Sequence, residues 1–510
     1  MCGTAIGNGF CMCQVGLTRS QCQDVRCTDD SGFTFLKDYS LPVFIIRARS
    51  QLKSIVSQIN TQLSNLSVKF QPDRLAFQNF GLVTFNNNDS TFDGQYFSSI
   101  EDLQAALQRL ALTSDNSGDC MDTTFSAINY AFNRFIMGNR SPMYVFTDAL
   151  PSDPEYLQNV VEFNSFVLSP IYIFQLEPSD TKCQSLDLFT PAWNALQTVA
   201  ARSSGNLFWV GGTQYSGVGN LFYNHMYNTY YRSDLMLADD ADECLNQQKY
   251  STVSIDSGFE TLAIVASGKE LDLILTSPEG KFVKPTVAVA LNFTSIWTLS
   301  GLQTGQWQIN LVSGDPNFRC SIRAYAAIPP ERAGMMPQRT LYWGWTTGLN
   351  YDSPLRQPLF GLENSMVLHI DGARIAQRHR LSAEVAIYER SRTGKVLSFA
   401  ANGLWRDECQ FEVYFPKYRC NRPDETLYFT VFFRDDNDFM VQRAGAMYCA
   451  AFRPTQVPPG TCQNGGFSLN NTCVCPPMYT GSVCQTPVCY NGGTPRRDFC
   501  DCVAGFEGTF

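Results

Sequence analysis

The cysteines of this chain follow a repeated spacing, and that repeat limits what the two ends can fold into. The chain has 19 cysteines in 510 residues. Near each end, a Cys-x-Cys pair has one cysteine before it and one after it, each separated from the pair by eight or ten residues. A further copy of this pattern begins at Cys489, close to the end of the chain. The cysteines in these copies are Cys2, Cys11, Cys13, Cys22, Cys462, Cys473, Cys475, Cys484, Cys489, Cys500 and Cys502. Units this short cannot bury a large core, so we expect disulfides to stabilise them by roughly 2–4 kcal/mol each.

Small residues follow the first cysteine of a copy, as in Asn464-Gly465-Gly466, and a glycine such as Gly481 lies late in the last loop. The pattern resembles the EGF module without its first and third cysteines. The resemblance implies the pairs Cys2–Cys11, Cys13–Cys22, Cys462–Cys473, Cys475–Cys484 and Cys489–Cys500, and leaves Cys502 free because its partner falls beyond Phe510. Zinc is the alternative, but it is typically bound by Cys-x2-Cys pairs or histidines. The chain has Cys-x-Cys pairs and three scattered histidines, which favours disulfides.

The composition and short motifs indicate the compartment of this chain and exclude some classes of partner. The formal charge is −9, from 38 basic and 47 acidic residues, which argues against a nucleic-acid partner. No apolar run reaches the roughly 18 residues of a membrane span, so we expect no membrane anchor in this chain. We expect a secreted, extracellular glycoprotein, of which this chain is a piece. Its glycosylation sequons are at Asn65, Asn88, Asn139, Asn292 and Asn470.

Between the cysteine-rich ends, the first long segment alternates short apolar runs with amphipathic stretches. The runs cover residues 41–46, 80–85, 143–148, 170–175 and 207–210. The stretches cover residues 52–66, 100–110, 123–135, 154–163 and 188–201, where apolar residues return every three or four positions. This pattern predicts βαβ units, and hence an α/β doubly wound domain with a mostly parallel sheet covered on both faces. Ligands bind such sheets at the carboxyl ends of the strands.

Two further segments alternate apolar and polar residues between turn signals, which predicts two β-sandwiches. The fold class is therefore multidomain: an α/β domain, two β-sandwiches and small disulfide-rich modules. We place a partial EGF-like module at 1–27, the α/β domain at 28–235, the sandwiches at 244–326 and 331–453, an EGF-like module at 460–485 and a truncated one at 486–510.

The α/β segment carries motifs of a known family. Gly118-Asp119-Cys120, Ser126-Ala127-Ile128, Tyr144 to Ala149 and Cys183 resemble the von Willebrand factor A domain, in particular the divergent type that opens hemicentins. That type is followed by a sandwich with a turn like Ser277-Pro278-Glu279-Gly280. The resemblance implies a Cys120–Cys183 bridge, and because the termini of such folds lie close together, it suggests Cys27–Cys244. The pairing of Cys320, Cys409, Cys420 and Cys449 stays open.

The resemblance also points to a substituted metal site. In metal-binding A domains the first strand ends in Asp-x-Ser-x-Ser, and later loops offer Thr and Asp as hard oxygen ligands for Mg²⁺. Here Arg47 takes the carboxylate position, Arg49 and Gln51 replace the hydroxyls, and Asp122 and Asp148 remain nearby. We therefore expect the metal site to be lost, and no cofactor.

Two interpretations of Arg47 are open. Its guanidinium could stand where the metal would stand and pair with Asp148. Alternatively, the site has simply decayed, with Arg47 solvated in a loop and Asp148 capping the next segment. We favour decay. The sequence Ser152-Asp153-Pro154 is itself a good helix start.

Evidence for an enzyme is weak. The chain has no Gly-x-Ser-x-Gly elbow, phosphate loop or histidine-rich metal motif. The acidic pairs Asp239-Asp240 and Asp435-Asp436 are more typical of a solvated surface. The aromatic stretch 222–231 could be a recognition patch, but packing of Phe222, Met226 and Tyr230 against the core is favoured, with His225 exposed or half-buried and without a metal role.

These features together predict a secreted adhesion or recognition protein, not an enzyme. We expect an extracellular protein or glycan ligand, bound without metal by the loops at residues 47–51, 120–123 and 148–152. Chains of this organisation resemble large secreted nematode proteins, some linked to infection responses, so a secreted immune-recognition factor is the first alternative. An extracellular enzyme with an unrecognised site is the second.

Overall fold

The fold comes from a computed structural model. It describes residues 41–69, 79–86, 91–110, 112, 120–135, 137, 141–167, 169–178, 183, 190–231, 235–243, 248–256, 259–315, 319–327, 341–346, 357–370, 383–391, 394–405, 412–434 and 440–451, with short pieces of both ends. The expectations for the Tyr230 side chain, for Asp435-Asp436 and for the Cys27–Cys244 bridge lie outside what the structure describes.

The first domain is built on a six-stranded mixed sheet in the order β12-β11-β9-β5-β6-β7. The strands are β5 (Val43–Arg47), β6 (Phe80–Asn86), β7 (Thr91–Phe97), β9 (Met143–Thr147), β11 (Ile171–Leu176) and β12 (Leu207–Val210). All neighbours are parallel except β6 and β7. The five parallel strands coincide with the five predicted apolar runs. The sequence pattern missed the antiparallel edge strand β7, because its exposed half gives no continuous apolar run.

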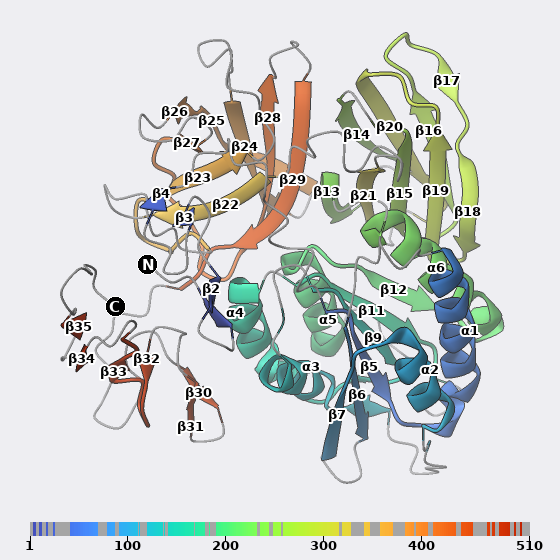
Figure 1. The fold of residues 1–510 in the computed structure, drawn as a ribbon. Coiled ribbons are helices and arrows are strands. Elements are labelled where there is room, and N and C mark those ends of the chain that lie inside the picture. The colour runs from blue at the N-terminus through green and yellow to red at the C-terminus, as the bar shows by residue number, and fades with distance from the viewer. Residues whose placement is uncertain are drawn as a thin grey trace.

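Helices cover both faces of this sheet, as Figure 1 shows. Three helices pack on Phe44 and Ile46 on one face: α1 (Lys53–Lys69), α2 (Ile100–Gln108) and α6 (Val218–His225). Helix α6 continues into a π-helix at Met226–Tyr231. On the other, α3 (Thr124–Arg134), α4 (Leu157–Val167) and α5 (Pro191–Arg202) pack on Val43 and Ile45. Alternate side chains of one strand thus enter two different cores. The 3₁₀ turns are Ser50–Leu52, Pro154–Tyr156 and Gly212–Gly217.

The next segment forms two antiparallel sheets. The five-stranded sheet has the order β13-β21-β15-β19-β18 and the four-stranded sheet the order β14-β20-β16-β17. Their strands are β13 (Leu235–Glu243), β14 (Gln248–Ile255), β15 (Thr261–Ser267), β16 (Leu271–Thr276), β17 (Phe282–Val283), β18 (Thr286–Leu291), β19 (Thr294–Ser300), β20 (Gly305–Ser313) and β21 (Arg319–Ala327). Both sheets contribute side chains to one core around Trp297 and Trp307, so they pack face to face.

Residues 341–451 form a second pair of sheets, ordered β22-β23-β27-β26 and β25-β24-β28-β29. Their strands are β22 (Leu341–Thr346), β23 (Ser365–Ile370), β24 (Ala383–Ser391), β25 (Gly394–Asn402), β26 (Leu404–Trp405), β27 (Glu412–Tyr414), β28 (Thr426–Arg434) and β29 (Met440–Tyr448). Trp345 and Phe429 lie in their shared core. The disulfide Cys420–Cys449, with 6.0 Å between Cα atoms, settles one pairing that the sequence left open.

The cysteine-rich ends show only short hairpins in the described residues. These are β1 (Thr4–Ile6), β2 (Phe10–Met12), β3 (Leu17–Thr18), β4 (Asp24–Val25), β30 (Phe467–Leu469), β31 (Thr472–Val474), β32 (Tyr479–Thr480), β33 (Thr486–Pro487), β34 (Thr494–Pro495) and β35 (Cys500–Asp501). The expected bridge Cys489–Cys500 is present, with Cα atoms 5.6 Å apart.

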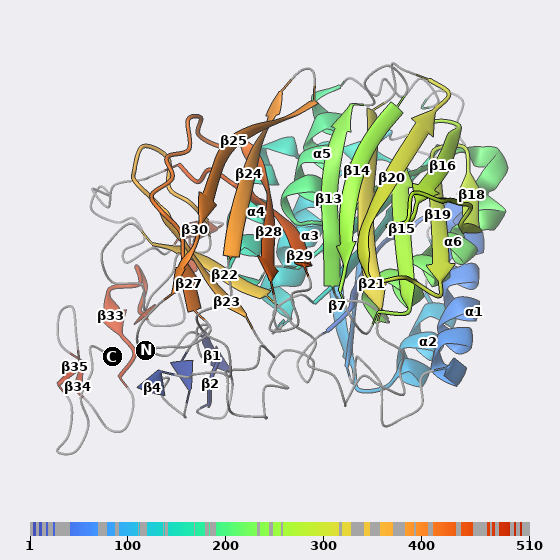
Figure 2. The same cartoon turned by 90° about the horizontal axis from the view of Figure 1, so that it is seen from above.

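The three large parts pack on one another (Figure 2). The five-stranded sheet lies against the first domain, because Val265, Ile296 and Tyr325 share a core with Phe222. Tyr448 of β29 lies in the core that covers the opposite face of the first domain. Within the described residues, no helix is long and apolar enough to cross a membrane.

Candidate functional site

The candidate site lies at the carboxyl end of the sheet, where β5 ends. Arg47 is the last residue of β5, a central strand flanked by β9 and β6. Only 1% of its surface is exposed, so its charge is taken out of water. A buried guanidinium requires carboxylate partners, because an isolated buried charge is very costly.

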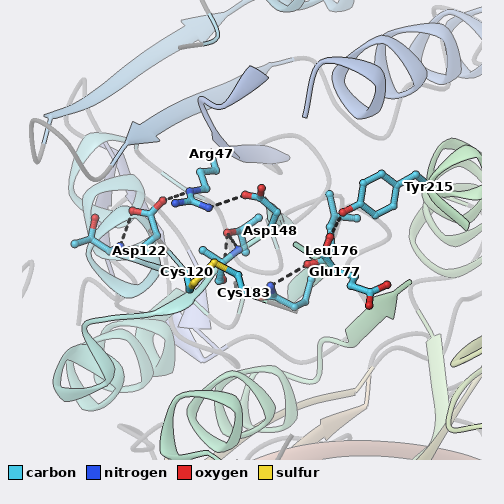
Figure 3. Close-up of polar contacts among 12 residues, drawn as sticks. Arg47, Cys120, Asp122, Asp148, Leu176, Glu177, Cys183 and Tyr215 are labelled. Atoms are coloured by element: carbon cyan, nitrogen blue, oxygen red, sulfur yellow. Dashed lines mark hydrogen bonds and ion pairs between the residues drawn. A yellow bond between two sulfur atoms is a disulfide. The ribbon is translucent and has the colours of Figure 1, made fainter. Parts of the chain in front are cut away.

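Two aspartates supply that partnership, as Figure 3 shows. Nη1 of Arg47 donates to Oδ1 of Asp148 at 2.7 Å. Nε of Arg47 forms an ion pair with Oδ2 of Asp122. Asp122 and Asp148 are themselves 0% and 3% exposed. Three charged side chains, one from the end of β5 and two from separate later segments, therefore meet in one buried cluster, which we call the Arg47 cluster.

This arrangement corrects the favoured interpretation of the sequence. Arg47 is not solvated in a loop, and Asp148 does not cap the next segment; the two side chains bind each other. The sequence placed Asp122 only in an irregular loop, yet Asp122 is the second partner of Arg47. The pairing of Arg47 with Asp148, which we considered the weaker interpretation, is the one present.

Backbone pairing sets the loops that carry the two aspartates. The short strands β8 (Met121–Asp122) and β10 (Leu150–Pro151) pair in parallel. The backbone N–H of Leu150 donates to the Cys120 carbonyl at 3.1 Å, and that of Ser152 to the Asp122 carbonyl at 2.7 Å. The Cys120–Cys183 disulfide that the family resemblance implied is present beside them, with Cα atoms 5.2 Å apart.

The neighbouring Asp153 has a role that differs from the expected one. It does not cap the 3₁₀ helix that begins at Pro154. Its carboxylate instead accepts from the backbone N–H groups of Phe125 at 3.2 Å and Ser126 at 2.7 Å. N–H groups in the first turn of a helix have no acceptor within that helix. Asp153 supplies one, so it caps α3, which starts 29 residues earlier in the chain.

The electrostatics of the cluster are unbalanced, with one cation and two carboxylates. Burial raises the pKa of the Asp122 carboxyl above its ordinary value; the nearby Arg47 charge opposes this and the Asp148 charge adds to it. The hydrogen bond from the Thr123 backbone N–H to Oδ1 of Asp122, at 2.8 Å, also favours the ionised form.

A second polar group lies at the same end of the sheet. Burial, together with the Asp148 and Glu177 charges, raises the pKa of the Tyr215 hydroxyl. The protonated hydroxyl donates to the carbonyl oxygen of Glu177. The Glu177 carboxylate accepts from the backbone N–H of Gly212 at 2.6 Å. Sequence reasoning missed this group, because neither residue belongs to a motif.

The residues present do not fit a divalent metal ion. Arg47 lies between the two carboxylates that would hold such an ion, and a guanidinium offers donors where a cation needs lone pairs. Arg49 is 6% exposed and Gln51 half-buried, and neither supplies a hydroxyl. Among the residues that the structure describes, no three His, Cys, Asp or Glu side chains gather as a metal site.

Half of the residues in the predicted ligand-contact loops are buried. Ala149 and Leu150 are 0% and 5% exposed, and the side chains of the Arg47 cluster are buried as well. The side chains of these loops that reach the surface include Ser50, Met121 and Ser152. A ligand at this end would therefore touch this rim while the Arg47 cluster holds the loops from below.

Other candidate residues have different surroundings from those predicted. His225, expected to be exposed or half-buried, is 0% exposed among Tyr144, Tyr172 and Phe208. The core packing of its neighbours Phe222 and Met226 is confirmed, at 0% and 1% exposure.

Asp239 was expected to belong to a solvated acidic pair. It is 3% exposed and forms an ion pair with buried Arg323 at 3.0 Å. The sequon residues Asn65 and Asn292 are exposed, whereas Asn88, Asn139 and Asn470 lie outside the described residues.

Comparison with known proteins agrees with this geometry. Residues 42–211 match the family described as the von Willebrand factor A domain, so this part of the chain is similar to such a domain. The chain is 33% identical over 497 residues to Protein irg-7 of Caenorhabditis elegans, covering 96% of this chain and 22% of that protein. A segment of 55 residues is 44% identical to human Fibrillin-3, covering 9% of this chain and 2% of that protein.

The chain thus spans about a fifth of the length of the nematode relative and a small fraction of the human one. Among solved structures, human COPII-coat protein Sec24c matches with a TM-score of 0.28 and 8% identity, covering 83% of this chain and 46% of that one. That score is too low to support a statement about fold or function.

Proposed function

We propose that this chain is part of a secreted extracellular binding protein, not an enzyme, whose A domain recognises its ligand without a metal ion. The disulfides Cys120–Cys183, Cys420–Cys449 and Cys489–Cys500 support an oxidising compartment. The exposed sequon residues Asn65 and Asn292 are accessible to glycosylation. The ligand we expect is an extracellular protein or glycan.

The Arg47 cluster is the observation that carries the proposal. In a metal-dependent site, a divalent cation would bind the carboxylates of separate loops and a carboxylate of the ligand. Here the guanidinium pairs with both Asp122 and Asp148 inside the domain. The cluster is buried, so it organises the loops but does not itself reach a ligand. Recognition would fall to the exposed rim at Ser50, Met121 and Ser152.

Isothermal titration with MgCl₂ and MnCl₂ tests the metal-independent part. The chain is expected to bind neither ion more tightly than about 1 mM. The Arg47→Ser variant removes the cation and leaves two carboxylates facing a hydroxyl, so it is expected to bind Mn²⁺ more tightly than the native chain. Adding Asp148→Ala to that variant should abolish the gain. A micromolar site in the native chain that Asp148→Ala removes would contradict the proposal.

A secreted immune-recognition factor is the second candidate. A nematode protein that is 33% identical and aligns with 96% of this chain favours this candidate. The organisation of the chain also resembles large secreted nematode proteins, some of them linked to infection responses. Binding to an array of microbial glycans and extracellular matrix proteins separates the two candidates. Selective retention by microbial glycans supports immune recognition, and selective retention by matrix proteins supports adhesion.

A further inference from the structure

The four-stranded sheet β14-β20-β16-β17 has an outer face that the first domain does not cover. The five-stranded sheet of the same sandwich packs against that domain through Ala263, Val265 and Ile296. The inner face of the four-stranded sheet carries the core residues Trp307 and Leu273. The outer face of the four-stranded sheet therefore points away from the sandwich core and from the first domain. Figure 2 shows β14, β20 and β16 side by side in this sheet.

The strand register sets which side chains share this outer face. Tyr250, Asn310 and Ile274 are directly paired across β14, β20 and β16 and so form one row. The next row along the same face contains Thr252, Gln308, Thr276 and Phe282, paired across all four strands. Side chains two residues apart on a strand lie on the same face, so the two rows are adjacent.

Large apolar side chains on this face are exposed to water. Phe282 is 83% exposed, Tyr250 is 69% exposed and Ile274 is 38% exposed. Between these side chains lie the amides of Gln308 and Asn310 and the hydroxyls of Thr252 and Thr276. We call this surface, formed by the two rows, the aromatic face. Exposed aromatic rings beside neutral hydrogen-bonding groups are typical of binding surfaces.

The charge of the aromatic face limits what it can bind. Neither row contains a charged residue, and the acid nearest along β16, Asp272, lies in the following row. A nucleic acid or an anionic membrane requires basic side chains, which the two rows lack. Sugar rings offer the complementary chemistry: their C–H faces stack on aromatic rings, and their hydroxyls both donate to and accept from amides.

We propose that the aromatic face binds a neutral polysaccharide chain. Tyr250 on β14 and Phe282 on β17 are separated by three strand spacings, roughly 14 Å, which gives room for several sugar rings in a row across the sheet. Tyr250 and Phe282 stack on pyranose rings, and the exposed amide of Gln308 binds hydroxyls between them. This site is separate from the A domain and goes beyond its proposed recognition role.

Affinity electrophoresis in gels containing laminarin, mannan, soluble cellulose ether or glycol chitin tests the proposal, with heparin as an anionic comparison. The chain is expected to be retarded by at least one neutral polysaccharide and not by heparin. Tyr250→Ala and Phe282→Ala are each expected to weaken retardation about tenfold, or about 1.4 kcal/mol. The double variant should migrate as in a gel without polysaccharide.

Two controls separate loss of binding from loss of fold. Tyr96→Ala removes an aromatic ring that is 55% exposed on β7 of the first domain, and it should leave retardation unchanged. Tyr250→Phe and Phe282→Tyr keep the stacking rings and should retain binding. The proposal is overturned if no neutral polysaccharide retards the chain, if only heparin does, or if the double variant binds as the native chain does.

Discussion

At the scale of single residues, the chemistry of Arg47 depends on where its partners lie. Arg47 and Asp148 are 101 residues apart in sequence, yet their side chains meet at 2.7 Å. A buried ion pair gains little over an apolar replacement, but removal of one partner leaves a buried charge without compensation. The Arg47 cluster is therefore sensitive to single substitutions even if its net contribution to stability is small.

We expect Arg47→Ala and Asp148→Ala each to lower the free energy of unfolding by about 3–5 kcal/mol. In the double variant the two losses should not add, giving a coupling energy of about 1–3 kcal/mol by urea denaturation. Asp148→Asn provides a milder variant, because its amide oxygen still accepts from Arg47. The matched control is the exposed pair Lys417–Glu363, at a similar distance of 2.6 Å, where coupling should lie within experimental error. Coupling near zero for Arg47 and Asp148 would mean that the pair contributes no mutual stabilisation.

His225 is a second residue whose surroundings determine its titration. Burial, with a smaller contribution from the Arg323 charge, lowers the pKa of His225 to about 3. Its ring lies 4.2 Å from that of Tyr172 between centroids. The folded state keeps this imidazole neutral, whereas the unfolded chain takes up a proton below about pH 6.5.

Stability should therefore be complete above pH 6.5 and fall as the pH drops toward 3. The loss attributable to His225 between pH 7 and pH 5 is about 2 kcal/mol. His225→Phe removes the titrating group and should reduce the acid loss by that amount, measured by urea denaturation at both pH values. Other acidic groups titrate equally in both proteins, so their contribution cancels in the difference. An unchanged pH dependence would show that His225 is not held neutral.

At the scale of elements, sequence periodicity located the five main helical stretches of the first domain and its parallel strands, but not the capping of α3. The residue before α3, Thr123, makes no side-chain capping hydrogen bond. Asp153 supplies the acceptor from the loop after β10. The Asp153 cap therefore links the start of α3, through hydrogen bonds, to the segment that also carries Asp148.

Asp153→Ala should destabilise the domain by about 2 kcal/mol, because one buried and one part-buried N–H group of α3 lose their acceptor. Asp153→Asn should cost less, since the amide oxygen still accepts one hydrogen bond. Ser99→Ala, which removes a local cap from α2, is the comparison and should cost about 1 kcal/mol. Thermal unfolding of the three variants measures the differences, and an equal or smaller loss for Asp153→Ala would contradict this role.

At the scale of the whole molecule, Gln442 joins the two sandwiches. Its Nε2 donates to the Leu237 carbonyl at 2.9 Å and the Thr252 carbonyl at 3.0 Å, and its Oε1 accepts from the Ser254 N–H at 2.9 Å. Leu237 lies at the register shift of β13, and β14 is the edge of its sheet. Gln442 thus satisfies backbone groups that the ladders leave open. Arg443 adds a buried ion pair with Asp256 at 3.2 Å.

Gln442→Ala should lower stability by about 3 kcal/mol, because three backbone groups lose a partner at a buried interface. We also expect the calorimetric transition to broaden or split as the two sandwiches unfold less cooperatively. Gln95→Ala, an exposed amide on β7, should leave both the midpoint and the shape unchanged. A single sharp transition at the native midpoint for Gln442→Ala would show that this residue does not couple the sandwiches.

The sequence by itself determined the α/β alternation, the two alternating β segments and the substitutions at Arg47, Arg49 and Gln51, because hydrophobic period and residue chemistry are local properties. Edge strand β7 escaped detection since half of it is exposed, and so did the Gln442 contacts, which depend on two distant strands. Only the tertiary structure decided that Arg47 is buried between Asp122 and Asp148. The reason is physical: the state of a charged side chain depends on the dielectric and the counter-charges around it, and residues distant in the sequence supply both.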